Sequence, residues 1–557
     1  MEISVIFPRV TEEDLRLSSK FLLEPEVVSR IRVLADAMRS SRSAIVFTNT
    51  RSMAEALGHR MSRIFSELKI HVHHSSLSRE ARVESETLLK SGELSAVIST
   101  SSMELGIDVG HIDIVLQYGS PRQAVKLLQR VGRAGHGPKG VAKGLIITQD
   151  SDDFLESLVL TKNALEGKLE ELRVMENSYD VLYHTVVGML LREKEISVQD
   201  ILEVARRSYP YRNLGVEELR RLLSFMSRAW PKLIWYDEGS DFVRRMNEAA
   251  FEYFFSNVST IPETSSYSVV DEVTGFYIGK LDEVFVLEYL FPGAKFVFRG
   301  SIWRMKRIEG SIIYVEQVFD PIGAIPSWIG EQLPVSREVA TEVGRLRRRV
   351  GEAHREDKID TLVKEIAREH MFSTEDDIKQ ALLPIIEHIE NNYPLPTDRS
   401  IVIEGIRGGA VIHSTQGSLV NRTLGRAIAH AMARHFRLMV RVSEDPYRIL
   451  IFGVALEPVI KALKIVTNES KEFFLEAIEN SSFFRIRLMH TAKRLGLVRD
   501  YVSSRVVSLS KLAKAYEGTP VYEEALRETL AKDFDLESTM NLLESIRFGE
   551  VEVILTE

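Results

Sequence analysis

Residues 129–136 combine cationic and flexible positions in a way that suits the binding of phosphate groups. The segment reads Gln-Arg-Val-Gly-Arg-Ala-Gly-His, so Arg130 and Arg133 lie three residues apart. A guanidinium group is a planar, permanently charged fork that matches phosphate oxygens. Gly132 and Gly135 leave room for a ligand to approach the backbone closely. The pattern predicts contact with a phosphorylated ligand.

Two further segments offer polar groups, Thr48-Asn49-Thr50-Arg51 and the stretch from Thr100 to Asp108. The hydroxyls of the second segment, with Gly106 and Asp108, could donate to a phosphodiester or a ribose. Each piece alone also has an ordinary structural explanation. Asp108 could cap a helix, Asn49 could shape a turn, and Gly-Arg-x-Gly often ends a helix.

The elements that must position these residues alternate along 1–163. Short β-branched runs are followed by amphipathic stretches, which predicts a parallel sheet with helices on both faces. The expected strands are Ser43–Phe47, Ile70–His73, Ala96–Ser99, Ile112–Leu116 and Gly144–Thr148, and the expected helices are Ser52–Leu68, Ser78–Lys90, Arg122–Arg133 and Asp152–Ala164. Ligands bind beyond the carboxyl ends of strands in such sheets. Because the three polar segments follow strands, a binding site is the favoured interpretation.

The segments FTNTR (47–51), STSSMELGID (99–108) and QRVGRAGH (129–136) resemble motifs IV, V and VI of superfamily-2 helicases. In those helicases the three motifs lie on the second of two RecA-like lobes. MELGID and QRVGRAGH are most similar to the Lhr, or large helicase-related, group. The resemblance covers essentially the whole chain. It implies ATP and Mg²⁺ in a cleft between two lobes, and a single strand that crosses both.

The resemblance also implies roles for individual residues. Arg133 would reach the γ-phosphate as an arginine finger, and Gln129 would position its loop. Many relatives have a second arginine where this sequence has His136, so Arg130 is the candidate substitute. The catalytic candidates are Arg133, Arg130 and Gln129; the nucleotide-binding candidates are Gly106, Asp108, Gly132 and His136; the nucleic-acid-binding candidates are Asn49, Thr50, Arg51, Thr100, Ser101 and Trp328.

A phosphate-binding loop of the form Gly-x4-Gly-Lys-[Ser/Thr] is not found in the sequence. Asp282-Glu283-Val284-Phe285 resembles a DExH box only superficially, since its fourth residue is not histidine and it follows the finger motif. The chain opens where the linker between lobes would lie. The chain reads as one half of a split helicase, a truncated product or an excised fragment. We therefore expect no metal site here, ATP and Mg²⁺ held mainly by an absent first lobe, a separate P-loop polypeptide as partner, and negligible hydrolysis by this chain alone.

The remaining sequence predicts a multidomain α/β protein. After a RecA-like lobe at 1–163, helical spacing and a short strand predict a winged helix at 164–240. Period-two alternation predicts a small β-barrel-like domain at 241–335, and 336–557 reads as an α+β domain. Trp328, in a proline- and glycine-flanked loop, is suited to base stacking. Trp303 is expected in the core, and His413 is expected to be structural.

Composition excludes several classes of protein. The 557 residues carry a formal charge of −8 and no cysteine, which rules out disulfide scaffolds, thiolate zinc sites and iron–sulfur clusters. The lack of a long apolar run or signal pattern predicts no membrane partner and a cytoplasmic location.

The favoured function is an ATP-dependent, Lhr-type helicase or translocase, 3′-to-5′ on single-stranded or forked DNA, with RNA or a hybrid left open. The alternative is a nucleic-acid-binding or annealing module without motor activity.

Overall fold

The computed structural model describes residues 1–75, 77, 79–104, 111–135, 140–259, 266–283, 285–286, 290–298, 301–318, 325–326, 333–498 and 509–556. The chain forms two compact units, and each draws on distant parts of the sequence. Unit 1 comprises Met1–Glu171, Glu331–Asn468 and Glu537–Glu557, and unit 2 comprises Leu172–Gly330 and Glu469–Leu536. Contact-based units do not test the four-domain division, which stays a prediction.

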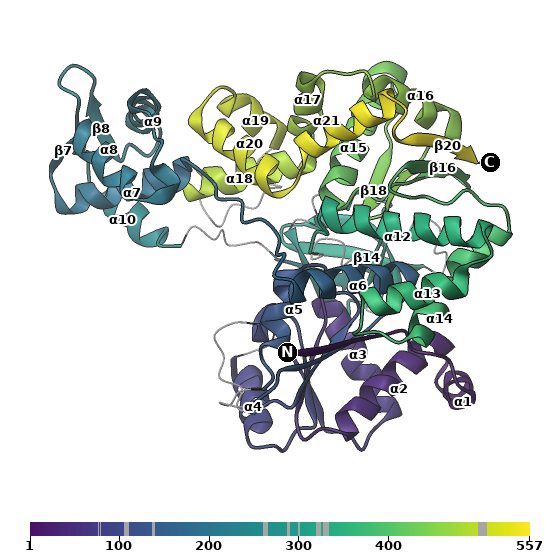
Figure 1. Ribbon diagram of the computed structural model, residues 1–557. Helices are drawn as coiled ribbons and strands as arrows, with labels where there is room; N and C mark the ends of the chain where they lie inside the picture. The colour runs from purple at the N-terminus through teal and green to yellow at the C-terminus, as the bar shows by residue number, and fades with distance from the viewer. Residues whose placement is uncertain are drawn as a thin grey trace. The chain divides into compact units, whose positions relative to one another are not determined.

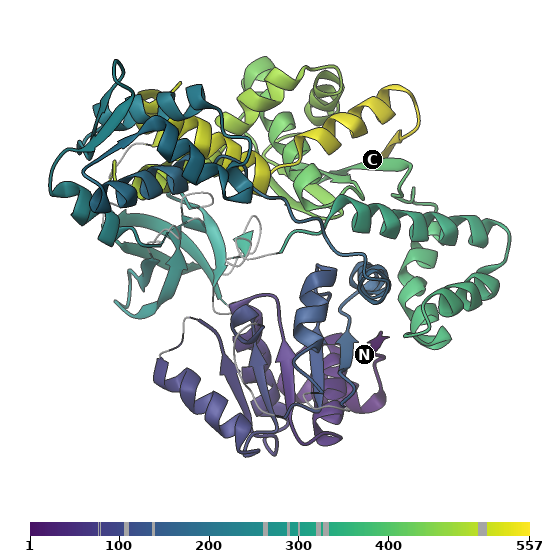
Figure 2. The same ribbon diagram turned by 60° about the vertical axis from the view of Figure 1, so that its left-hand side comes forward.

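Unit 1 begins with a six-stranded parallel sheet in the order β1-β6-β5-β2-β4-β3. Its strands are β1 (Glu2–Ile6), β2 (Ala44–Phe47), β3 (Ile70–His73), β4 (Ala96–Ser99), β5 (Ile114–Tyr118) and β6 (Lys143–Ile147). The predicted doubly covered parallel sheet is confirmed (Figures 1 and 2). The strand β1 at its edge has no counterpart among the expected strands.

Helices cover both faces of this sheet and create two apolar cores. Alternate strand residues such as Ile45 and Val46 belong to different cores, because successive side chains point to opposite faces. The elements are α1 (Glu12–Phe21), α2 (Pro25–Arg39), α3 (Arg51–Ile64), α4 (Arg79–Lys90), η1 (Ser101–Met103), α5 (Ala124–Val131) and α6 (Ser151–Leu165). Helix α6 is buried on nearly all sides, which indicates a second layer packed on it.

That second layer comes from the C-terminal half of the chain. Helices α12 (Arg337–Arg355), α13 (Ile359–Glu369) and α14 (Glu375–Glu390) share a core with α6. They lead into a five-stranded sheet, β18-β19-β17-β16-β20. Its elements are β16 (Ser400–Ile406), β17 (Gly409–His413), α15 (Ser418–Ala431), η4 (Met432–Phe436), β18 (Arg441–Asp445), β19 (Arg448–Phe452), α16 (Leu456–Val466), α21 (Leu536–Arg547) and β20 (Glu552–Thr556).

Unit 2 contains a small helical domain with a three-stranded sheet, β7-β9-β8, as expected of a winged helix. Its elements are α7 (Tyr179–Arg192), β7 (Glu195–Ser197), α8 (Val198–Arg206), η2 (Tyr209–Tyr211), α9 (Val216–Arg228), β8 (Ile234–Asp237), β9 (Phe242–Arg245) and α10 (Ala249–Ser256). Helices α17 (Lys471–Glu479), α18 (Ser482–Arg494), α19 (Leu509–Tyr516) and α20 (Pro520–Lys532) belong to the same unit.

The β-rich segment of unit 2 forms a mixed six-stranded sheet in the order β11-β10-β14-β13-β12-β15. Its strands are β10 (Ser266–Asp271), β11 (Tyr277–Asp282), β12 (Lys295–Phe298), β13 (Ser301–Glu309), β14 (Ile312–Val318) and β15 (Ile325–Pro326). The apolar run at 284–287 predicts a strand, but Phe285 and Val286, the two of its residues that the structure describes, are helical. Trp303 lies in the core, as predicted, and its indole N–H donates to the Phe298 carbonyl at 3.0 Å.

Candidate nucleotide and nucleic-acid site

Arg130 connects the three polar segments inside the RecA-like lobe. Its side chain is only 1% exposed. Nη1 donates to Asn49 Oδ1 at 2.9 Å and to Gln117 Oε1 at 2.8 Å, and Nε donates to Glu104 Oε1 at 2.9 Å. Asn49 follows β2, Gln117 lies on β5, and Glu104 follows η1. The structure therefore brings together the segments that the sequence separates by as many as 81 residues.

Glu104 is the buried anion of this network. Lys126 and Arg130 lie four residues apart on α5, so both point to the same side of the helix and bind Glu104 at 2.6 and 2.7 Å. Burial lowers the pKa of Arg130, while the Glu104 carboxylate acts in the opposite direction. The arrangement fixes α5, and with it the loop that follows.

Arg133 lies one turn beyond Arg130, just past the end of α5. Its backbone N–H donates to the Arg130 carbonyl at 2.9 Å. Its side chain is half-buried, and the buried Nε donor has no hydrogen-bond partner among the described residues. Gln129 likewise has a buried Oε1 acceptor without a described partner. These two atoms are the unsatisfied polar groups that a bound ligand could satisfy.

Gly132 provides the tight turn between Arg130 and Arg133. A Cβ atom here would lie 2.8 Å from the Leu128 carbonyl oxygen, closer than real contacts allow. Gly135 has φ +75°, and a Cβ there would lie 2.7 Å from the Ala142 nitrogen. Both glycines are required by local geometry, whatever ligand is bound.

The segment after β2 contributes three candidates. Thr50 caps α3, since its Oγ1 accepts the Met53 N–H at 3.2 Å. Asn49 is held on both sides, because its Nδ2 also donates to the Ser120 carbonyl at 2.8 Å. Arg51 is exposed at the first position of α3. Of these side chains, Arg51 is the most accessible to a nucleic acid.

Beyond β4, Thr100 is 7% exposed and Ser101 is exposed. Gly106, Asp108, His136 and Trp328 lie outside the described residues. Sequence reasoning missed the roles of Glu104 and Gln117, both 1% exposed. Each could have been found as a charged or amide residue within or beside an apolar strand, because a polar side chain buried there requires a hydrogen-bond partner.

A second buried polar cluster attaches the C-terminal segment to this lobe. Asp152 at the start of α6 pairs with Arg347 of α12 and with Arg448 of β19. Glu156, one turn on, accepts from the Tyr447 hydroxyl at 2.6 Å and binds Arg122 at 3.0 Å. Burial acts to raise the pKa of Asp152, but the two arginines hold it below its usual value.

The histidine expected to be structural has a carboxylate partner that sequence reasoning did not anticipate. His413 Nε2 lies 3.0 Å from Glu404 Oε2 on the neighbouring strand. Burial lowers the pKa of His413, and Glu404 opposes that shift. Nearby, the Asn421 side chain donates to the Ser414 and Asp445 carbonyls at 3.0 Å. These contacts close a corner of the fold and leave the structural interpretation of His413 in place.

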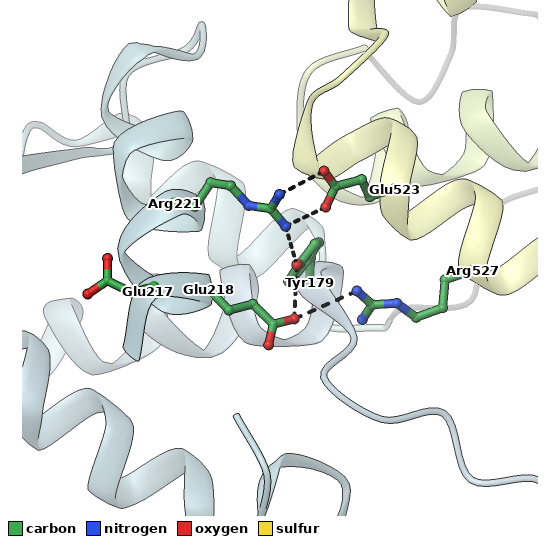
Figure 3. A pocket seen from close by; sticks show the side chains of 6 residues that line it. All are labelled: Tyr179, Glu217, Glu218, Arg221, Glu523 and Arg527. Atoms are coloured by element: carbon green, nitrogen blue, oxygen red, sulfur yellow. Dashed lines mark hydrogen bonds and ion pairs between the residues drawn. The ribbon is translucent and has the colours of Figure 1, made fainter. Parts of the chain in front are cut away.

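Unit 2 contains a hollow of about 510 Å³ between α7, α9 and α20 (Figure 3). It is lined by Tyr179, Glu217, Glu218, Arg221, Glu523 and Arg527. Arg221 donates to the Tyr179 hydroxyl at 2.9 Å and pairs with Glu523, and Tyr179 donates to Glu218 at 2.9 Å. The cations and anions bind each other, so the hollow is an ion-pair cluster that fastens α20 to the winged-helix region.

Three family models match successive parts of the chain. They are the helicase conserved C-terminal domain at residues 27–137, the winged helix domain of large helicase-related protein at 162–321, and the DEAD/H associated model at 395–557. The chain is Lhr-like. The resemblance inferred from the motifs is confirmed.

Curated relatives agree with this assignment. The ATP-dependent helicase Lhr-Core of Methanothermobacter thermautotrophicus is 31% identical over 554 residues, covering 94% of this chain and 63% of the relative. The Lhr helicase/uracil glycosylase of Escherichia coli is 26% identical, covering 93% of this chain and 37% of the relative. The Lhr-like chain thus spans less than two thirds of these relatives.

A solved structure shares the fold. The Mycobacterium smegmatis helicase Lhr, bound to ssDNA and AMP-PNP, aligns with a TM-score of 0.76 at 23% identity. The alignment covers 100% of this chain and 69% of that chain.

No helix in the described part of the Lhr-like chain is both long and apolar enough to cross a bilayer.

Proposed function

We propose that this chain supplies the second motor lobe and strand-guiding domains of an ATP-dependent, Lhr-type helicase or translocase acting on single-stranded or forked DNA. The observation that carries the proposal is the Arg130 network, which joins three helicase-like segments at one edge of a parallel sheet. The Lhr-like fold and relatives support it. The proposed domains are 1–163, 164–240, 241–335 and 336–557.

The described residues fit one side of an ATP site. The unsatisfied Arg133 Nε donor and Gln129 Oε1 acceptor, both buried, are polar atoms that a nucleotide could engage. ATP, when bound, supplies the phosphoanhydride whose cleavage drives translocation. In this proposal Arg133 stabilises charge on the terminal phosphate, with Gln129, Gly132 and the residues at 106, 108 and 136 completing this wall.

Arg130 is a positioning residue in this proposal. Its guanidinium nitrogens bind Asn49, Glu104 and Gln117, so it orients the loop that carries Arg133. Asn49, Thr50, Arg51, Thr100, Ser101 and Trp328 are the proposed strand contacts. Among the described residues no cluster of three His, Asp or Glu side chains could hold a metal ion, so no Mg²⁺ ligand is assigned.

The motor requires a first RecA-like lobe with the phosphate-binding loop, in the same polypeptide or another. Without that lobe we expect negligible ATP hydrolysis.

A two-lobe enzyme carrying Arg133→Ala should lose DNA-stimulated ATP hydrolysis by at least about 10³-fold. Strand binding, measured by fluorescence anisotropy in the same samples, should change less than about threefold, since other groups provide most phosphate contacts. Equal loss of both activities would contradict the finger assignment.

The alternative is a binding or annealing module without motor activity, and the same assay separates the two. Wild-type two-lobe enzyme that binds strands, yet shows no strand-stimulated hydrolysis, would favour the alternative. Lys126→Ala serves as a control for the variant, because Lys126 lies on α5, the helix that precedes Arg133, and contacts Glu104 instead of the nucleotide wall.

A further inference from the structure

Four arginines lie near one end of the five-stranded sheet of unit 1, one in the turn between β16 and β17 and three within residues 434–441. The strand register places Gly409, Phe452 and Arg441 side by side in β17, β19 and β18. Arg407 lies in the turn just before Gly409, so it projects from the same end as Arg441. This sheet end also receives the carboxyl end of α15, as the next contacts show.

Helix α15 packs against β18, and two contacts show that the helix and the strand run in opposite directions. Arg422 binds Glu444 near the end of the strand at 2.7 Å, and Arg426 donates to the Val442 carbonyl at 3.3 Å. Continuing in that direction, Arg434 in η4 and Arg437 just beyond it lie beside the start of β18. Arg407, Arg434, Arg437 and Arg441 are hereafter the sheet-end arginines.

The charge of this region departs from that of the whole protein. Residues 418–444 contain five arginines and one carboxylate, Glu444, whereas the chain as a whole has a net charge of −8. Arg407, Arg434 and Arg437 are exposed and Arg441 is half-buried. Burial lowers the pKa of Arg441, so a bound anion would stabilise its charged form.

The simplest alternative to a binding surface is a solvated face whose arginines form ion pairs with nearby carboxylates. Helix α12 has such a face. There Arg345, Arg348 and Arg349 bind carboxylates at 2.8–2.9 Å. By contrast, Arg407 and Arg437 form no ion pair with any residue that the structure describes. Glu457, in the first turn of the adjacent α16, is itself paired with Lys461 at 2.7 Å.

The exposed part of this cluster consists of Arg407, Arg434 and Arg437, with the half-buried Arg441 beside them in the sequence. Arg422 and Arg426 do not belong to it, because they face β18 and bind Glu444 and the Val442 carbonyl. Several exposed cations at one sheet end fit a polyanion with repeated phosphates better than a single phosphate group, and cationic contacts to phosphates carry no sequence information.

We propose that the sheet-end arginines form a second nucleic-acid contact, separate from the motor motifs, which binds the phosphate backbone without regard to sequence. The inference rests on the proposed function, because it extends the path of the strand or duplex onto the C-terminal α+β region.

The test measures binding of the full chain to a fluorescein-labelled single strand and to the matching duplex, by anisotropy, between about 50 and 200 mM salt. Arg407→Ala/Arg437→Ala removes two exposed cations from two segments. The slope of log K against log salt should fall by about 1.4 for the single strand, or about 1.8 for the duplex, if both cations contact phosphates. The form whose slope falls by its own expected amount is the form that lies on this surface.

Arg355→Ala/Arg368→Ala is the matched control, since these exposed arginines lie on α12 and α13 of the same unit. It changes the net charge equally and should leave the slope unchanged. Arg407→Lys/Arg437→Lys should retain most of the slope, which separates charge loss from misfolding. Wild-type binding with equal slopes in the alanine pair and the control overturns this inference alone. Failure of the wild-type chain to bind either form overturns the inference and the proposed function together.

Discussion

At the scale of single residues, Arg130 and Arg133 show how neighbouring arginines of one motif take different tasks. Arg130 is 1% exposed and its nitrogens bind three side chains, whereas Arg133 retains a buried donor without a described partner. A guanidinium that is already saturated orients its surroundings; one with an unsatisfied donor can bind a ligand. Stability and catalysis should therefore separate between the two positions.

Arg130→Ala is expected to destabilise unit 1 by about 3–5 kcal/mol, because it leaves the Glu104 carboxylate buried without its main partner. The measurement is the unfolding midpoint in urea, followed by circular dichroism. Lys126→Ala should cost about 1 kcal/mol or less, since Lys126 is partly exposed and water can replace it. Arg133→Ala should leave the midpoint unchanged. Similar midpoints for Arg130→Ala and wild type would contradict the positioning role.

At the scale of elements, helix α20 is held to α7 by groups that respond to pH. Glu524 accepts the Tyr179 backbone N–H at 2.9 Å, and burial, together with the Asp180 carboxylate, raises its pKa to about 7. In the unfolded chain the same carboxyl ionises near its ordinary value of 4.5. The folded state therefore binds an extra proton between these two values, and its stability falls as pH rises through that window.

Glu524→Gln keeps an amide of the same shape that cannot ionise. Relative to this variant, the wild type should lose about 2–3 kcal/mol of stability between about pH 4.5 and about pH 7. Comparison with the variant cancels opposing groups such as His490, whose pKa burial lowers to about 4. Differential scanning calorimetry at both ends of the window provides the measurement. A constant difference between the two proteins across pH would refute the assignment.

At the scale of the whole molecule, helix α6 belongs to the RecA-like lobe in sequence and to a shared core in space. Its Phe154, Leu155 and Leu158 lie in one apolar cluster with Val339 and Val343 of α12. Asp152 and Glu156 add buried polar contacts to Arg347, Arg448 and Tyr447. The lobe alone would expose these groups to water.

A fragment of residues 1–171 is therefore expected to associate or to bind an apolar dye, because about 1.5–3 kcal/mol is lost for each large apolar side chain left exposed. The measurement is size-exclusion chromatography with dye fluorescence. The same fragment joined through flexible linkers to 331–468 and 537–557 should be monomeric and unfold cooperatively. A monomeric 1–171 fragment with an equally high unfolding midpoint would show that the shared core is dispensable.

The sequence by itself determined the local elements and the family. The strands Ile70–His73, Ala96–Ser99 and Ile112–Leu116 were recognisable because buried parallel strands are short β-branched runs, and the structure matches the first two to the residue. The motif at Gln129–His136 was also recognisable from the sequence, because the spacing of residues along the chain is a local property. The expected strand at 284–287 failed where a short apolar run fitted either helix or strand.

Only the tertiary structure decided which side chains meet. Arg130 finds acceptors 13, 26 and 81 residues away, a choice set by the strand order β5-β2-β4 and by no periodicity in the sequence. The same holds for β1, which pairs with β6, and for Arg407 and Arg441, which the register of three strands places at the same sheet end. Side-chain pairing depends on long-range register, because a strand's own sequence does not specify its neighbour.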